Sequence, residues 1–235
     1  MQRYFGNIKN NQAILNEDDI HHITHVMRMR AGDEFELVND GSLYIVLIQS
    51  IKPFAAIIKD KVITDVEINK KITLFFALAK GDKIELVIQK ATELGVHRIV
   101  LFKSRRCIVN LTEEDFSKKL PRYQKIAKEA SEQCHRLIVP EIVGVVDINN
   151  IPNEYKSDIN FIAYEKNAGI IGNVLDDIKN KTVSIMVGPE GGFEEKEVQK
   201  LLEEGFTSIS LGKRILRCET AAIYALSVIA YLMEK

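Results

Sequence analysis

Two segments in the last third of the chain combine a short apolar run, a loop that contains glycine and the start of a helical pattern. Residues 184–193 read Ser-Ile-Met-Val-Gly-Pro-Glu-Gly-Gly-Phe, and residues 211–222 read Leu-Gly-Lys-Arg-Ile-Leu-Arg-Cys-Glu-Thr-Ala-Ala. Glycine lets the backbone adopt positive φ and lets a ligand approach closely. Because open α/β sheets bind ligands at the carboxyl ends of their strands, the two loops are predicted to form the floor of a ligand pocket.

The alternation of strand and helix extends upstream to residue 72. Residues 72–79 are almost continuously apolar, which is typical of a parallel strand covered on both faces. This alternation predicts an α/β fold with a parallel sheet. Strands are expected at residues 72–79, 99–102, 159–163, 183–187 and 208–211. One helix is expected to be capped by Asp82 and closed by Gly95, others are expected to begin at Pro121, Glu194 and Thr220, and one more is expected within residues 170–178.

The first 70 residues have a different, β-rich pattern. One short helix is expected at residues 19–29, capped by Asp18. Asp40 and Gly41 separate two alternating runs, and Asp-Gly tolerates the positive φ of tight hairpin turns. We therefore predict a small barrel or sandwich at residues 1–70 and a second domain at residues 71–235.

Composition narrows the class of protein. The 235 residues carry a net charge of −1, so binding of nucleic acid would depend on local basic patches. Cys107, Cys134 and Cys218 form no C-x-x-C pair, which argues against a zinc ribbon or a disulfide framework. The start of the chain lacks the apolar core of a signal peptide, and the late apolar run at residues 221–233 is short for a membrane span. A soluble cytoplasmic protein is the simplest expectation.

An ordered set of motifs covers nearly the whole chain. The set begins with His25-Val26-x-Arg28 and continues with residues 89–95, 104–106 and 132–136. It ends with G-P-E-G-G-F at residues 188–193 and L-G-x-R-I-L-R-x-E-T-A at residues 211–221. The set resembles the uracil-N3 methyltransferases of small-subunit ribosomal RNA, the E family within the SPOUT superfamily of knotted methyltransferases. Cys218 departs from the pattern, since threonine is more usual there.

The resemblance implies a PUA-like RNA-binding barrel followed by a SPOUT-type parallel sheet with a C-terminal trefoil knot. It also implies a homodimeric enzyme that uses S-adenosylmethionine to methylate N3 of a specific uridine in 16S ribosomal RNA. The substrate would be the RNA itself or the small ribosomal subunit that contains it. Neither a metal nor a membrane is implied.

The loop at residues 188–192 suits this cofactor chemically. Glu190, Glu194 and Glu195 would repel a polyphosphate, whereas carboxylates suit a ligand with hydroxyls and a positive centre. The alternative is a tight turn with a solvated carboxylate. The resemblance assigns cofactor binding to Ala163, Tyr164, Glu165, Val187, Gly188, Pro189, Glu190, Gly191, Gly192, Leu211, Gly212, Ile215, Leu216 and Thr220. Among these, Leu211, Ile215 and Leu216 would form an apolar slot for the adenine.

Arg217 and Glu219 are the candidate catalytic residues. Uracil N3 is a poor nucleophile until its proton leaves, so the site must remove that proton or stabilise the resulting anion. Arg217 could pair with a uracil oxygen, and Glu219 could orient Arg217 or relay the proton. The alternative for Glu219 is an ion pair at the start of a helix.

Small groups of basic residues are the candidates for RNA contacts, because arginine pairs well with phosphate oxygens. The candidates are Arg28, Arg30, Lys103, Arg105, Arg106 and Arg136. The alternative for each is a solvated surface position. His21 and His25 are one helical turn apart, but no H-E-x-x-H pattern accompanies them. Two other functions stay open: a non-catalytic RNA-binding module, and a hydrolase that binds nucleotide phosphates with the glycine loop.

Overall fold

The computed structural model describes residues 1–165, 169–170 and 178–235. The chain forms two compact units. The first combines Met1–Glu67 with Ser131–Val139, and the second combines Ile68–Ala130 with Pro140–Lys235. The sequence-based division at residues 70 and 71 did not include the return of residues 131–139 to the first unit. The helix expected within residues 170–178 falls, apart from its end residues, outside the described part of the chain.

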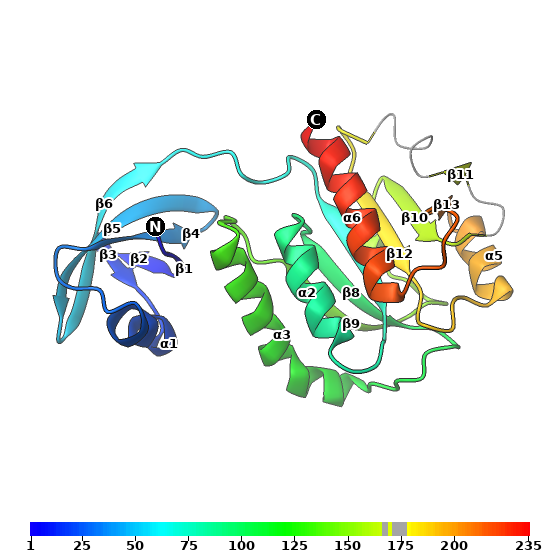
Figure 1. Ribbon diagram of the computed structural model, residues 1–235, viewed down its shortest axis with the longest axis horizontal. Helices are drawn as coiled ribbons and strands as arrows, with labels where there is room; N and C mark the ends of the chain where they lie inside the picture. The colour runs from blue at the N-terminus through cyan, green and yellow to red at the C-terminus, as the bar shows by residue number, and fades with distance from the viewer. Residues whose placement is uncertain (166–168, 171–177) are drawn as a thin grey trace. The chain divides into compact units, whose positions relative to one another are not determined.

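The first unit is built on a six-stranded sheet (Figure 1). Its spatial order is β1-β4-β5-β6-β3-β2, in which β1 pairs with β4 in parallel and the remaining pairs are antiparallel. β2 also contacts β4, so the sheet curls back on itself. The expected turn between β4 and β5 is present, with φ of 47° at Asp40 and 69° at Gly41. The strands are β1 (Arg3–Phe5), β2 (Asn7–Lys9), β3 (Gln12–Ile14), β4 (Glu34–Asn39), β5 (Ser42–Ile51) and β6 (Phe54–Val62).

The short helix of this unit differs from its predicted form. It comprises α1 (Glu17–His21) and a π-helical turn, η1 (His22–Val26). Its N-cap is Asn16, whose side chain accepts a hydrogen bond from the Asp19 amide at 2.7 Å. The expected cap, Asp18, lies inside the helix, because Asn16 is three residues before that amide, the spacing at which an N-cap side chain accepts a hydrogen bond.

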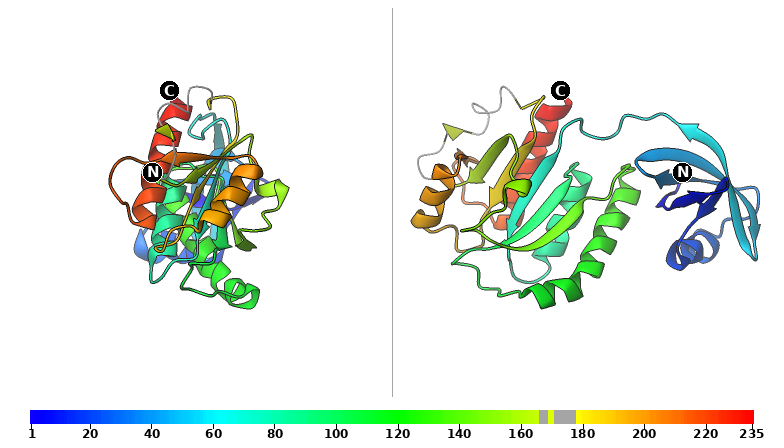
Figure 2. Two further views of the ribbon diagram at one scale, coloured as in Figure 1. Left: turned by 90° about the vertical axis from the view of Figure 1, so that its right-hand side faces the viewer. Right: turned by 180° about the vertical axis from the view of Figure 1, so that it is seen from behind.

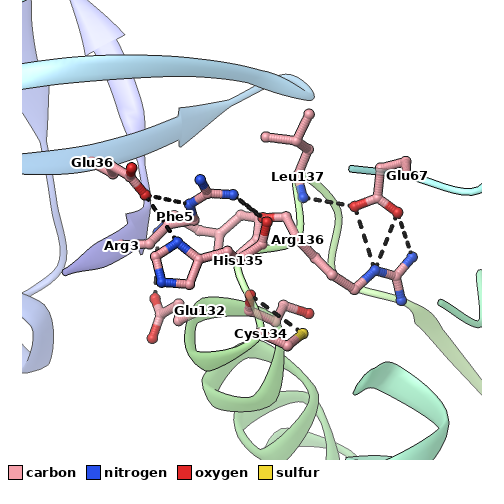
Figure 3. A network of polar contacts seen from close by, with 10 residues as sticks. Arg3, Phe5, Glu36, Glu67, Glu132, Cys134, His135, Arg136 and Leu137 are labelled. Carbon is pink, nitrogen blue, oxygen red and sulfur yellow. Dashed lines mark hydrogen bonds and ion pairs between the residues drawn. The ribbon is translucent and has the colours of Figure 1, made fainter. Parts of the chain in front are cut away.

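Residues 131–139 complete the first unit through polar and apolar contacts (Figure 3). Arg3 donates to the Glu36 carboxylate at 2.8 Å and to the carbonyl of His135. The Glu132 carboxylate accepts a hydrogen bond from the Phe5 amide at 3.3 Å. Leu137 packs with residues of β4 and β5 in a small core cluster. The returning segment therefore supplies partners for the first strand of the sheet.

The second unit contains a seven-stranded sheet whose pairings are all parallel. Its order is β11-β13-β10-β12-β7-β8-β9. Every residue of β7 is buried, as the apolar run predicted. β9 is a strand that was not predicted from the sequence. The strands are β7 (Ile72–Ala77), β8 (Arg98–Lys103), β9 (Glu141–Asp147), β10 (Ile159–Ala163), β11 (Gly169–Ile170), β12 (Val183–Val187) and β13 (Phe206–Ser210).

Helices cover both faces of this sheet. α2 and α6 lie side by side in front of the sheet in Figure 1, and α6 also contacts β12. From behind, in Figure 2, the strands lie in front of these two helices. Val198 and Leu201 of α5 pack in a core cluster with Phe75 and Phe102 of the sheet. The helices are α2 (Lys83–Glu93), α3 (Glu113–Gln133), α5 (Glu195–Glu203), α6 (Cys218–Glu234) and the 3₁₀ turn η2 (Asn153–Tyr155).

α3 begins eight residues before the position that proline indicated. The helix starts at Glu113, and Pro121 lies within it. Thr112 accepts a hydrogen bond from the Asp115 amide at 3.1 Å, and the Asp115 carboxylate accepts one from the Thr112 hydroxyl at 2.8 Å. These reciprocal bonds satisfy the start of the helix, so the proline is not its first residue.

Candidate functional site

Three of the predicted cofactor segments follow consecutive strands of the sheet. β10 lies between β12 and β13, so the two glycine loops follow strands that are separated by one strand. Residues 163–165, at the end of β10, occupy the position between them. Since all three strands are parallel, their carboxyl ends lie at the same edge of the sheet.

The loop after β12 is a tight turn whose glycines are required by geometry. The Gly192 amide donates to the Pro189 carbonyl at 2.9 Å, and Gly192 has φ of 68°. A Cβ at Gly188 would lie 2.8 Å from the Phe193 ring. That ring is buried and stacks parallel to Phe102, with 6.3 Å between centroids. Gly188 thus lets the backbone pass directly over an aromatic core side chain.

Lys83, the first residue of α2, joins this loop to the start of α6. Its Nζ lies 2.9 Å from Glu190 Oε1 and 3.5 Å from Glu219 Oε2. Glu190 also accepts a hydrogen bond from the Lys80 amide at 3.3 Å, and the Cys218 thiol donates to Glu219 at 3.3 Å. The sequence analysis missed Lys83 because it is 107 residues from Glu190 along the chain. Neither a lysine at the start of a helix nor a distant glycine loop indicates by itself that the two are in contact.

The ionisation of this cluster follows from its contacts. Burial raises the pKa of Glu190, but the hydrogen bond from Lys83 and those from backbone amides outweigh burial and lower it. For Glu219, burial is likewise outweighed by its own amide, the Cys218 thiol and Lys83, and its pKa is lowered. The hydrogen bond to Glu190 raises the pKa of Lys83. Burial and the bond to Glu219 raise the pKa of Cys218 to about 11. All three charged groups are therefore ionised at neutral pH, and the thiol is not.

The second loop places its polar and apolar residues on the surface. Gly212 has φ of 109°, a value that favours glycine. Leu211 and Leu216 are half-buried, and Ile215 is 99% exposed. Arg217 is exposed and is the N-cap residue of α6, where its carbonyl accepts the Ala221 amide at 2.8 Å.

The expected contact between Arg217 and Glu219 is replaced by other contacts. The side chain of Glu219 is engaged by Lys83 and Cys218. Among the residues that the structure describes, none forms an ion pair with Arg217. Its guanidinium is therefore available to a ligand, whereas Glu219 is held in place. Thr220 follows on the exposed side of the first turn of α6.

The segment after β10 is tied to β13 by its backbone. The Tyr164 amide donates to the Ile209 carbonyl at 3.0 Å, and the Tyr164 carbonyl accepts from the Ser208 hydroxyl at 3.0 Å. Ala163 and Tyr164 are half-buried, and Glu165 is exposed. The Tyr164 backbone can offer a ligand only the second lone pair of its carbonyl, so side chains and neighbouring backbone groups must supply the other contacts.

The arginine loop after β8 contacts the glycine loop. Arg106 donates to the Gly191 carbonyl at 3.0 Å. The Arg105 amide donates to the buried Glu197 carboxylate at 2.9 Å, while the Arg105 side chain is 76% exposed. Lys103 is exposed and donates to Asn110 at 2.7 Å. Two candidate RNA-binding residues therefore lie directly beside a candidate cofactor loop.

Comparison with known proteins identifies the family. Residues 66–230 match the model of an RNA methyltransferase domain, and residues 15–60 match that of an RNA methyltransferase PUA domain. A ribosomal RNA small subunit methyltransferase E of Bacillus subtilis is 36% identical over 256 aligned residues, which cover the whole chain and 98% of the relative. The chain belongs to the ribosomal RNA small subunit methyltransferase E family. The expected combination of a parallel α/β fold and a PUA domain is thereby confirmed.

Two solved structures similar to this member of the E family contain the same small molecule. A ribosomal RNA small subunit methyltransferase E of Neisseria gonorrhoeae, bound to S-adenosyl methionine, is 32% identical with a TM-score of 0.83. A Legionella pneumophila protein in complex with the bound cofactor SAM is 31% identical with a TM-score of 0.87. Each similarity covers 97% of this chain and 96% of the other.

Arg136, which was predicted to bind RNA, is instead buried in an ion pair within the first unit of this E-family chain. Arg136 is 4% exposed, and its guanidinium donates to the Glu67 carboxylate at 2.8 Å and 3.1 Å (Figure 3). The other oxygen of Glu67 accepts from the Leu137 amide at 2.7 Å. Burial and this ion pair give the Arg136 guanidinium a structural role, and the structure therefore lends no support to its assignment to RNA.

Arg28 and Arg30 are exposed in the first unit, close to the π-helical turn. Arg28 has φ of 54°, and the Arg30 amide donates to Asp33 at 2.7 Å.

His21 and His25 stack with 4.5 Å between ring centroids. In the described ranges, no group of three or more His, Cys, Asp or Glu residues could hold a metal ion. No described helix has the length and apolar character needed to span a membrane.

Proposed function

We propose that this chain transfers a methyl group from S-adenosylmethionine to N3 of a specific uridine in 16S ribosomal RNA. The observation that carries the proposal is the placement of three predicted cofactor segments at consecutive parallel strand ends. Membership of the E family and the two similar structures with S-adenosylmethionine support it. The remaining alternatives are an RNA-binding module without activity and a nucleotide hydrolase.

The residues at the strand ends fit this cofactor. Gly188 is crowded by the Phe193 ring, and Gly192 and Gly212 have positive φ, so glycine is favoured at all three positions. A ligand can therefore approach the backbone of these loops without meeting a side chain there. Glu190 places an ionised carboxylate in the first loop, which suits hydroxyls and a positive centre and disfavours a polyphosphate. The cofactor would be held by residues 163–165, 187–192, 211–212 and 215–216 together with Thr220. The exposed Ile215, with Leu211 and Leu216, would close on the adenine.

The cofactor supplies a methyl group on a positively charged sulfur, which needs no covalent activation by the protein. The residues of the chain have to prepare the acceptor. Arg217, exposed at the start of α6, would pair with a uracil carbonyl oxygen and stabilise the anion formed when the N3 proton leaves. Glu219, fixed by Lys83 and Cys218, would receive or relay that proton.

The exposed cations of both units are proposed to bind the RNA. Lys103, Arg105 and Arg106 belong to the second unit, and Arg28 and Arg30 to the first. Arg106 contacts Gly191, so RNA binding there would be adjacent to the proposed cofactor loop. Residues 1–70 would act as the PUA-like domain and residues 71–235 as the SPOUT domain.

A C-terminal knot and a homodimer belong to the same proposal. β13 lies two strands from β12, yet the following helix α6 contacts β12 and α2, a crossing compatible with a knotted path. α6 exposes Tyr224 and Tyr231 at 43% and 64%, and Leu86 of α2 is 41% exposed, which gives a second copy an apolar surface to cover. The enzyme would act in the cytoplasm, where its ribosomal substrate is found.

The test is mass spectrometry of 16S ribosomal RNA from cells that lack the protein. Loss of one N3-methyluridine, restored by the unmodified chain, is expected. An Arg217→Ala variant should fold and bind S-adenosylmethionine but should fail to restore the modification. If the RNA keeps all its N3-methyluridine, the proposed reaction is wrong. If the Arg217→Ala variant restores it fully, only the role of Arg217 is rejected.

A further inference from the structure

We infer that Lys83 is a positioning residue that clamps the loop at residues 188–193 to the first turn of α6. The inference rests on the proposed function for its role in catalysis. Lys83 lies on neither segment, yet its ammonium contacts a carboxylate of each: Glu190 at 2.9 Å and Glu219 at 3.5 Å. It would therefore fix the distance between the proposed cofactor loop and the proposed catalytic residues.

The position of Lys83 in α2 indicates that its ion pairs with Glu190 and Glu219 do more than stabilise that helix. Lys83 is the first residue of α2, where the helix dipole disfavours a positive charge. The preceding cap residue, Asp82, makes no side-chain capping bond. α2 is thus weakly capped at this end, and the lysine finds its compensation in Glu190 and Glu219 of other elements.

Without Lys83, the two carboxylates would oppose each other. Glu190 and Glu219 both lie within ion-pair distance of the same ammonium, and their side chains are only 28% and 14% exposed. Like charges that share a partly buried site repel, and one of them then tends to take up a proton. Removal of the lysine is therefore expected to separate the loop from α6, whereas removal of one carboxylate as well should relieve the repulsion.

Lys83, Glu190 and Glu219 are all ionised over the neutral pH range. The folded-state pKa of Lys83 is raised, so its stabilisation is present below the ordinary lysine pKa of about 10.4 and is lost as pH rises through the folded value. The pKa values of Glu190 and Glu219 are lowered, so their contribution is present above about 4.3 and is lost as pH falls through the folded values. All three groups are therefore charged throughout the neutral pH range, where the clamp should hold.

A matched control exists elsewhere in the second unit. Lys156 pairs with Glu204 at 3.0 Å, and the two side chains are 19% and 26% exposed, close to the values for Lys83 and Glu190. Lys156 precedes β10 and so lies at the amino ends of the strands, opposite the proposed site. Lys156→Met removes a similar ion pair without touching the two loops.

The first experiment compares amide hydrogen exchange of the ligand-free Lys83→Met, Lys83→Arg and Lys156→Met chains. Lys83→Met should accelerate exchange at residues 188–194 and 213–219 together, Lys83→Arg should restore most of the protection, and Lys156→Met should leave both segments unchanged. Acceleration confined to the first turn of α2, or to one of the two loops, would overturn the inference. This measurement needs no cofactor, so it decides the clamp even if the proposed function fails.

The second experiment measures the affinity for S-adenosylmethionine by calorimetry. Lys83→Met should weaken binding about tenfold, which corresponds to about 1.4 kcal/mol. Adding Glu219→Gln to Lys83→Met should recover part of that loss, because the repulsion between Glu219 and Glu190 is then removed while Glu190 keeps its carboxylate. A packing role of the lysine stem predicts no such recovery, and its absence would reject the inference. If the unmodified chain binds no S-adenosylmethionine, the proposed function is rejected instead.

Discussion

The substitution Gly188→Ala tests whether the loop after β12 depends on the space that glycine leaves. The new Cβ would lie 2.8, 3.0 and 3.1 Å from three carbons of the Phe193 ring. Favourable carbon contacts need about 3.5 to 4.0 Å, so the ring or the loop must move by about 0.7 Å. The ring is 5% exposed and stacks on Phe102, which restricts its movement.

Overpacking of this kind costs about 1 to 3 kcal/mol of the free energy of unfolding. For a domain of this size, that corresponds to a fall in Tm of about 2 to 12 °C. Because the loop moves, the affinity for S-adenosylmethionine should fall as well. Thermal unfolding of Gly188→Ala measures the change in Tm, and titration calorimetry measures the change in affinity for S-adenosylmethionine.

A second substitution identifies the cause. Phe193→Leu removes the ring that Gly188→Ala would strike, so the double variant should be destabilised by less than the sum of the two single variants. The difference should exceed about 0.5 kcal/mol, the usual scatter of additivity for independent sites. If the two free energies simply add, or if Gly188→Ala leaves Tm unchanged, the steric argument is refuted.

Three further outcomes are expected. Arg136→Met should lower the free energy of unfolding of the first unit by about 3 kcal/mol, because it leaves a carboxylate of a largely buried pair without its cation; denaturant unfolding measures this, and a loss below about 0.5 kcal/mol would contradict it. The double variant Arg105→Ala with Arg106→Ala should reduce the slope of log affinity for RNA against log salt by about 1.4, in filter binding at several salt concentrations, and an unchanged slope would reject these contacts. Cys218, with its pKa raised to about 11, should be alkylated slowly at pH 8 and faster as pH rises toward that value; mass spectrometry of the labelled peptides measures this, and rapid labelling at pH 8 would contradict it.

The elements of the second unit could be predicted because their signals are local. β10 and β12 have the bounds that their apolar runs indicated, and the one polar residue in each, Asn160 and Ser184, is paired with the other by a hydrogen bond at 2.7 Å. The start of α3 was missed because Pro121 was interpreted as the first helical residue, a position that proline favours, whereas the helix begins at Glu113 and continues through it. Thr112 and Asp115 carried that signal, but the weight given to Pro121 concealed it.

The candidate site was predicted in its segments but not in its contacts. The glycine loops can be recognised as local motifs in the sequence, whereas the pairing of Lys83 with Glu190 depends on the order of the strands in the sheet. Arg136 shows the opposite case: an arginine in a basic group suggested phosphate binding, but its guanidinium is buried and pairs with Glu67, 69 residues away. Charge alone does not distinguish the two positions, because burial is a property of the whole fold.

The return of residues 131–139 to the first unit limits how that unit can be separated from the rest. A chain that stops near residue 70 would keep Arg3, Glu36 and Glu67 but lose the His135 carbonyl and the Arg136 guanidinium that they bind. Excision of a stable amino-terminal fragment therefore requires both stretches, for example with residues 131–139 joined after Glu67 through a linker. The first unit is compact in space but is assembled from two stretches that are separate in the sequence.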